Sequence, residues 1–143
     1  MTLTRRDVLW IGLGGIAVAA IPGLAPRSAQ AATVDELTKA FTGGAAAAND
    51  GITLTAPEIA ENGNTVPISV TAPGAVAIML LAIGNPEPAV ATFKFGPAAG
   101  SQMAATRIRL AKTQDVVALA KMADGSIKQA QATIKVTIGG CGG

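Results

Sequence analysis

The chain has 143 residues and contains no histidine, no tyrosine and a single cysteine. The lack of histidine excludes Ser-His-Asp and Cys-His catalysis, histidine general bases and histidine-ligated metals. With one cysteine, a zinc site or an iron–sulfur cluster held by several thiolates is also excluded within this chain. We therefore expect neither a metal nor a cofactor, and the common classes of enzyme are poor interpretations of this sequence.

Aromatic residues and excess positive charge are scarce as well. Only four residues are aromatic. The first 31 residues hold three of the 11 basic side chains and one of the 9 acidic ones, which leaves 8 of each sign in the remainder. Nucleic-acid binding calls for a basic face with aromatic stacking groups, so this class is excluded too. The length suits one domain.

The beginning of the chain has the features of an export signal. Arg5 and Arg6 precede an apolar run over residues 9–20, and small residues follow at 29–31 (Ala-Gln-Ala). A charged start, an apolar middle and an A-x-A end are typical of a cleaved signal peptide, and paired arginines indicate the twin-arginine route. The run is short for a bilayer span of about 20 residues. We therefore expect residues 1–31 to be removed, with no stable membrane anchor, and the mature protein to be periplasmic.

Twin-arginine export carries folded proteins, and a chain without cofactor ligands has little reason of its own to fold first. One such reason is a folded partner that lacks a signal and travels with it. The periplasm permits disulfides. A single cysteine there cannot pair within its own chain, so it pairs with another molecule or stays reactive.

The mature part begins with a helix and continues with strands. Residues 33–36 (Thr-Val-Asp-Glu) form a capping box, after which Val34, Leu37 and Phe41 share one helical face. Apolar/polar alternation then predicts about seven short strands. They cover Ile52–Ala56, Thr65–Ala72, Ala75–Ile83, Val90–Phe95, Ala105–Leu110, Asp115–Met122 and residues 129–138. Turns at intervals of about 8–12 residues predict an immunoglobulin-like antiparallel β-sandwich over residues 32–138.

Several details refine this prediction. Val66, Ile68 and Val70 face one way, but Pro67 indicates an edge strand or a bulge. The strand at 75–83 is apolar on both faces, which favours a central position. Asp124-Gly125 is a hairpin signal.

The last five residues, 139–143, read Gly-Gly-Cys-Gly-Gly and follow the final strand directly. Because glycine lacks a Cβ, Gly139, Gly140, Gly142 and Gly143 predict a slim, flexible arm. This arm carries the Cys141 thiol to a distance of about 10 Å from the last strand.

A free thiol has a pKa near 8.5, and no neighbour of Cys141 in the sequence lowers it. The nearest base is Lys135, and the terminal carboxylate opposes ionisation. The chain is therefore a poor enzyme and a reasonable substrate for enzymes that supply their own activating groups.

The tail VTIGGCGG (residues 136–143) resembles the carboxyl terminus of SoxY, the sulfur-carrier subunit of the Sox thiosulfate-oxidising system. The resemblance extends over nearly all of the mature chain. It includes PEIAENGNTVPI at 57–68, Asn85-Pro86, Phe93 and TRIRLA at 106–111, together with the twin-arginine leader. The family is thus suggested by several separate blocks as well as by the arm.

The resemblance implies a role and a set of partners. Cys141 would carry thiosulfate-derived sulfur covalently, and a second subunit, SoxZ, would form a heterodimer with this chain. The haem cytochrome pair SoxAX would join Cys141 to thiosulfate as a cysteine S-thiosulfonate. The dimanganese hydrolase SoxB would release sulfate, and the sulfane dehydrogenase SoxCD would oxidise the remaining sulfur. The cofactors then belong to the partners.

Two other interpretations remain. The first is a periplasmic assembly module that is linked by an intermolecular disulfide through Cys141. The second is a ubiquitin-like sulfur carrier that would use the Gly143 carboxylate as a thiocarboxylate. The export signal and the β-sandwich pattern argue against this second alternative, because it requires ATP. Residues 62–64 are most simply a turn, and Arg107 and Arg109 a solvated strand face that has a weaker alternative role in steering anionic sulfur species.

Overall fold

The computed structural model describes residues 32–139, which begin with helix α2 (Val34–Thr42). The capping box is present: Glu36 N–H donates to Thr33 Oγ1 over 3.3 Å, and Thr33 N–H donates to Glu36 Oε2 over 2.9 Å. The backbone hydrogen bond from Thr33 holds the pKa of the Glu36 carboxyl below its usual value. The helix ends at Gly43, whose φ of 66° is left-handed. No helix among residues 32–139 has the length and apolar character of a membrane span.

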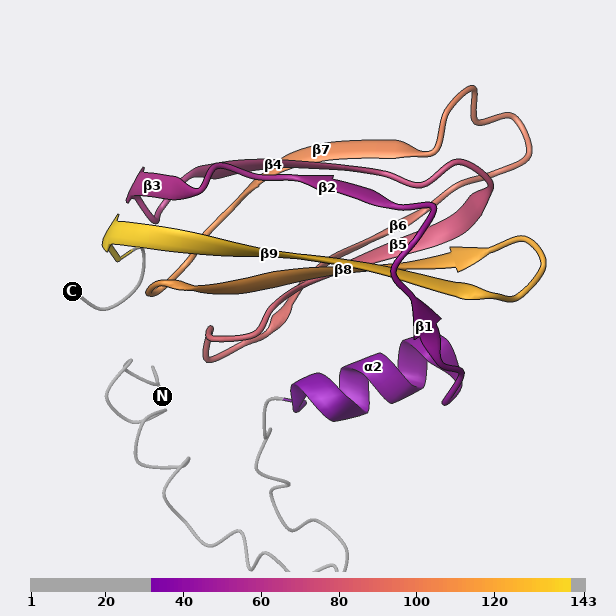
Figure 1. Ribbon diagram of the computed structural model, residues 1–143, viewed down its shortest axis with the longest axis horizontal. Helices are drawn as coiled ribbons and strands as arrows, with labels where there is room; N and C mark the ends of the chain where they lie inside the picture. The colour runs from indigo at the N-terminus through magenta and orange to yellow at the C-terminus, as the bar shows by residue number, and fades with distance from the viewer. Residues whose placement is uncertain (1–31, 140–143) are drawn as a thin grey trace, which may run out of the picture. The chain divides into compact units, whose positions relative to one another are not determined.

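Nine strands follow the helix, and they form two sheets (Figure 1). Their bounds are β1 (Ala47–Ala48), β2 (Thr53–Thr55), β3 (Ile59–Asn62), β4 (Val66–Thr71), β5 (Ala75–Ala82), β6 (Ala89–Lys94), β7 (Met103–Ile108), β8 (Gln114–Met122) and β9 (Ile127–Ile138). The larger sheet has the order β1-β9-β8-β5-β6, with β3 also paired to β9, and the smaller sheet has the order β2-β4-β7. The predicted β-sandwich with one short helix is thereby confirmed.

The segment from β1 to β3 changes sheets twice. β1 and β3 pair in parallel with the two ends of β9, whereas β2, between them, pairs antiparallel with β4 in the opposite sheet. The sequence did not predict β1 or β3, because two to four residues at a sheet edge carry too little alternation to be recognised.

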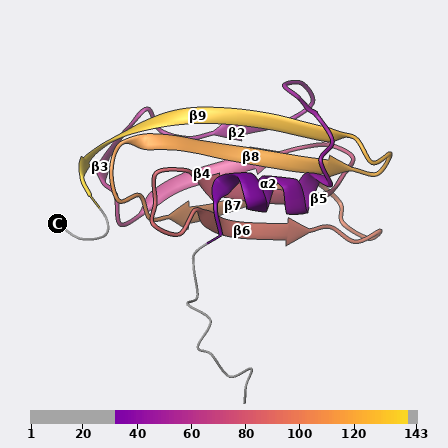
Figure 2. The same ribbon diagram turned by 90° about the horizontal axis from the view of Figure 1, so that it is seen from below.

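The main core fills the space between the two sheets. Its fully buried members include Val66, Val70, Ile78, Leu80 and Ile134. A second core lies on the outer face of the larger sheet, where α2 covers it (Figure 2). Its members are Met79, Leu81, Leu119 and Ile127, with Val34, Leu37 and Phe41 from the helix side. This second core explains why β5 is apolar on both faces.

Pro67 does not mark an edge strand, contrary to the prediction. β4 is the middle strand of the smaller sheet, between β2 and β7. However, β2 pairs only with Ser69–Thr71, so Pro67 lies beyond its end and β4 has a single neighbour there. A proline that has no N–H to donate is tolerated at such a position.

Candidate functional site

The structure describes one of the predicted site residues, Gly139, at the end of β9. The arm residues Gly140, Cys141, Gly142 and Gly143 and the signal residues Arg5 and Arg6 lie outside residues 32–139. The covalent role of the thiol, the flexibility of the arm and the export signal therefore remain predictions. What the structure supplies is the geometry of the root from which the arm departs.

The end of β9 extends beyond its neighbour β8. The register of β8 on β9 ends at Gln114 opposite Ile134, and the remaining four residues of β9 pair with β3 instead. Thr113 replaces the missing strand at one point, because its Oγ1 accepts a hydrogen bond from Val136 N–H over 3.0 Å. On the β3 side, Gly63 N–H donates to the Ile138 carbonyl over 2.8 Å. The end of β9, just before the arm, is thus hydrogen-bonded on both of its edges.

Residues 62–64 form the expected turn, and the turn also has a structural role at this site. Asn64 N–H donates to Asn62 Oδ1 over 2.9 Å, which is an Asx turn. Buried Gly63 donates to Ile138, as above, and its carbonyl accepts from Leu110 N–H over 2.8 Å. The turn therefore joins the end of β9 to the segment that follows β7.

Gly139 lies directly against that segment. A Cβ built on Gly139 would overlap the carbonyl oxygen of Ala111. Any residue with a side chain would have to push this part of the chain away. The sequence predicted Gly139 as a source of reach, and the structure adds a second reason for glycine at this position: a close approach of two backbones.

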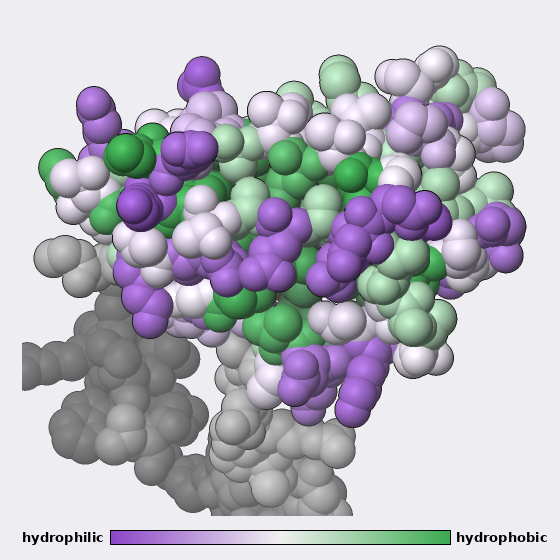
Figure 3. All heavy atoms as spheres, viewed as in Figure 1, coloured by the Kyte–Doolittle hydropathy of each residue, from purple (hydrophilic) through white to green (hydrophobic). Residues whose placement is uncertain are grey.

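The charged side chains near the root are solvated. Arg107, Arg109, Lys112 and Lys135 are all exposed. Within residues 32–139 the structure pairs one base with a carboxylate, Lys128 with Asp50 over 2.8 Å, near the opposite end of β9. The interpretation of Arg107 and Arg109 as a solvated face agrees with this arrangement. A hydrophilic band crosses the molecule at the level of β9, with hydrophobic side chains on both sides of it (Figure 3).

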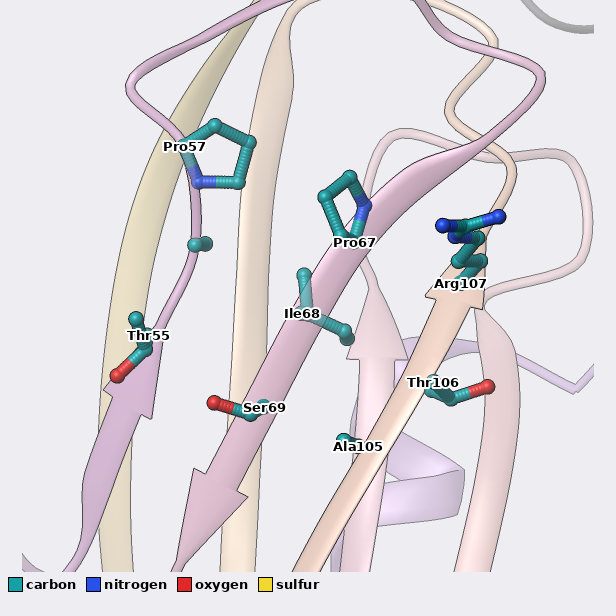
Figure 4. A pocket seen from close by; sticks show the side chains of 9 residues that line it. Thr55, Pro57, Pro67, Ile68, Ser69, Ala105, Thr106 and Arg107 are labelled. Carbon is teal, nitrogen blue, oxygen red and sulfur yellow. The ribbon is translucent and has the colours of Figure 1, made fainter.

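An open apolar groove of about 700 Å³ lies on the smaller sheet (Figure 4). It opens where β2 ends, so that Thr55 and Pro57 stand apart from Pro67 and Ile68 on β4, with Arg107 on β7 at one end. Two large apolar side chains near the arm root, Ile59 and Ile138, are 61% and 65% exposed. In the described part of the chain no three Asp, Glu, His or Cys residues gather as metal ligands would.

Comparison with known proteins gives the family. A sequence model described as "Sulfur oxidation protein SoxY" matches residues 38–141. The chain belongs to the SoxY family. It is also similar to the sulfur carrier protein SoxY from Chlorobium limicola f thiosulfatophilum, with 34% identity, a TM-score of 0.65, and coverage of 74% of this chain and 97% of that one. The resemblance inferred from the sequence blocks is confirmed, and a carrier role in sulfur oxidation follows.

More distant structures share the fold with this SoxY family member and nothing more specific. A superoxide reductase (neelaredoxin) from Ignicoccus hospitalis is 18% identical, with a TM-score of 0.53, and the match covers 59% of this chain and 79% of that one. No curated protein matches the sequence. The site must therefore be interpreted through the SoxY relatives and the geometry above.

Proposed function

We propose that this SoxY family member is a periplasmic carrier that holds thiosulfate-derived sulfur covalently on Cys141 and presents it to partner enzymes. The observation that carries the proposal is that the family match runs to residue 141 and so includes the single cysteine. A chain without histidine offers the thiol no histidine as a general base. The proposed role is accordingly that of a substrate-presenting subunit.

The loading step joins two sulfur atoms. The Cys141 thiolate and the outer sulfur of thiosulfate form an S–S bond, which gives a cysteine S-thiosulfonate. Two electrons leave in this oxidation, and a haem cytochrome partner of the SoxAX type accepts them. Free thiol loses its proton first, because only the thiolate reacts.

Unloading returns the thiol in stages. Water cleaves the bond between the outer sulfur and the sulfone group, which leaves as sulfate and two protons while a sulfane sulfur stays on Cys141. A hydrolase of the SoxB type catalyses this step. A dehydrogenase of the SoxCD type then oxidises the sulfane sulfur to a sulfonate group: three waters supply the oxygen atoms, six protons are released, and the dehydrogenase accepts six electrons. A second hydrolysis, with one more water, releases sulfate and a proton and frees the thiol. The carrier itself holds no cofactor in this scheme, and the sulfur on Cys141 is cargo.

The compartment and the first partner follow from the leader. Arg5 and Arg6 direct export through the twin-arginine route, and residues 1–31 are then removed. A folded heterodimer with SoxZ explains why a chain without cofactors uses this route. The groove between Thr55, Pro57 and Pro67 and the exposed Ile59 are apolar surfaces available to partners.

Intact mass spectrometry tests the proposal. Protein exported by cells given thiosulfate is measured before and after reductant, and the carboxyl-terminal peptide is then sequenced. Reductant-sensitive sulfur or thiosulfonate adducts on Cys141 are the expected result. A bare thiol under every condition would contradict the carrier role, and a disulfide-linked dimer without cargo would favour the assembly module. Sulfur on the Gly143 carboxylate would indicate the thiocarboxylate chemistry.

A further inference from the structure

The segment against which Gly139 lies, residues 109–113, has no regular secondary structure of its own. A connecting loop of this kind normally moves more than the strands that it joins. A contact with such a loop would fix the arm root poorly unless something else held the loop in place. The loop follows β7 and precedes β8, so its own ends are anchored in opposite sheets.

Asn85, from the distant loop between β5 and β6, holds the first part of this segment. Its Nδ2 donates to the Arg109 carbonyl over 2.8 Å, and its Oδ1 accepts from Ala111 N–H over 3.0 Å. The side-chain amide of Asn85 is therefore hydrogen-bonded to the backbone on both sides of Leu110, which is fully buried. The carbonyl of Ala111, the group that meets Gly139, belongs to the residue whose N–H is held.

Gln114 holds Asn85 in turn. Its Nε2 donates to Asn85 Oδ1 over 2.8 Å and to the Lys112 carbonyl over 3.2 Å, and its Oε1 accepts from Gly84 N–H over 2.8 Å. Gln114 is 7% exposed and is the one polar side chain buried in the described residues. It also fits closely, since a Cβ on Gly84 would come within 2.9 Å of Gln114 Cβ.

The Asn85–Gln114 pair differs from a packing contact because its hydrogen bonds fix the backbone and not other side chains. Buried polar groups such as the Gln114 amide are nearly always hydrogen-bonded. Each bond of Gln114 and of the partly buried Asn85 ends on the backbone of residues 109–112 or of Gly84, or joins the two amides to each other. None of them ends on a side chain outside the pair. The pair therefore determines where the backbone of the segment lies, including the Ala111 carbonyl.

We propose that Asn85 and Gln114 are positioning residues for the carrier arm. They hold the Ala111 carbonyl in place as a seat for Gly139, so the chain leaves the sandwich at a fixed point and in a fixed direction. This inference rests on the proposed function, because a fixed point of departure matters only if the arm presents cargo. The rate at which partners load Cys141 then depends on this contact between Gly139 and Ala111.

Distance measurements between two spin labels test the seat without any sulfur chemistry. One nitroxide is attached to Cys141 and the other to a cysteine introduced by Lys121→Cys, at an exposed position near the opposite end of the sandwich. The variants are Gly139→Ala, Asn85→Leu and Gln114→Leu in the full chain. The matched control is Gln102→Leu, because the side chain of Gln102 also holds a loop: its Oε1 accepts a hydrogen bond from Gly74 N–H over 3.3 Å.

The distance distribution is expected to shift or broaden in all three seat variants and to stay unchanged in Gln102→Leu. Loading of the unlabelled seat variants with thiosulfate by the purified haem partner is expected to slow by about tenfold, since a misplaced reactant loses up to about a hundredfold in rate. Gly139→Ala changes no core residue, so it remains informative even if an amide variant unfolds.

An unchanged distance distribution in folded Gly139→Ala protein would overturn the seat, and so would an equal change in Gln102→Leu. If the distances change while Cys141 never carries sulfur, the seat stands and the carrier function fails. If Cys141 loads normally and the distances do not change, the carrier stands and the seat fails.

Discussion

The two loops that flank β8 are held in different ways. After β8, the turn at 123–125 is closed by local side-chain bonds: Ser126 N–H and Oγ both donate to Asp124 Oδ1, over 2.8 and 2.6 Å. Before β8, the segment at 109–113 is held by two amides: Asn85, which lies 24 positions before Arg109 in the sequence, and Gln114, which directly follows the segment. One loop forms from its own residues, whereas the other requires the rest of the sandwich.

The difference matches what each loop has to do. The hairpin turn only reverses the chain between β8 and β9, and local hydrogen bonds suffice for that. The loop at 109–113 contacts the opposite end of β9, where the arm begins. Because one of its supports, Asn85, comes from the loop between β5 and β6, its position is tied to the folded domain as a whole. Four experiments would break or sharpen this comparison.

The largest effect is expected from Cys141→Ser, which removes the proposed site of the cargo and changes no residue of either loop. Thiosulfate oxidation in a reconstituted Sox system should fall to the level without carrier, because serine forms no S–S bond. The melting temperature and the association with SoxZ should equal those of the wild type. Residual turnover above the carrier-free level would exclude the proposed role of the thiol.

Gln114→Ala should cost far more stability than Ser126→Ala. It leaves Gly84 N–H without its acceptor and Asn85 Oδ1 without one donor inside the protein, and an unsatisfied buried group costs about 1–3 kcal/mol. Ser126 is partly exposed, so water replaces its bonds and the loss should be within about 0.5 kcal/mol. Urea unfolding of both variants measures the difference. Equal losses would mean that the amide pair is no more important than a turn.

The sequence predicted the hairpin turn but not the amide pair, because the turn depends on neighbouring residues and the pair depends on residues that are far apart in the sequence. Asp124-Gly125 carries its information locally, because glycine supplies the φ of 86° that the turn needs. Asn85 and Gln114 meet only after β5 and β8 have paired. In the sequence, Asn85-Pro86 belongs to the blocks that resemble SoxY, and nothing near it indicates a partner for the amide. Gln114 lies beside Asp115 at the polar start of β8, so its polarity alone does not set it apart as a buried residue.

The same distinction applies to the strands and the arm. Alternation predicted a strand at 129–138, where Ile134 is buried, but it gave no sign that Ile138 would be 65% exposed beyond the end of β8. Strand length in a sandwich depends on the partner, which the pattern of one strand does not contain. The run of glycines predicted Gly139 as part of a flexible arm, whereas its contact with Ala111 depends on the tertiary fold.

Bulky residues beyond the seat should slow the carrier without destabilising it. In Gly140→Val and Gly142→Val the arm becomes wider and stiffer, so entry into partner active sites should slow loading and unloading by about threefold to tenfold. Their melting temperatures should stay at the wild-type value. Gly100→Val is the matched control, because a Cβ there meets no atom within 4 Å. Wild-type kinetics in both arm variants would remove the argument that glycine is needed for access.

The smallest effect concerns pH, and it separates the two loops chemically. The side-chain and then the backbone hydrogen bonds of Ser126 lower the pKa of Asp124. The turn's contribution to stability is therefore complete above the unfolded pKa of about 3.9 and is lost as the pH falls through the lower folded value.

The amides of Asn85 and Gln114 do not titrate, so the seat should keep its full contribution in acid. Urea unfolding at pH 7 and pH 3 should show less loss on acidification in Asp124→Asn than in the wild type, whereas Gln114→Leu should lose as much as the wild type. A pH-dependent difference between Gln114→Leu and the wild type would show that a charged group takes part in holding the arm root.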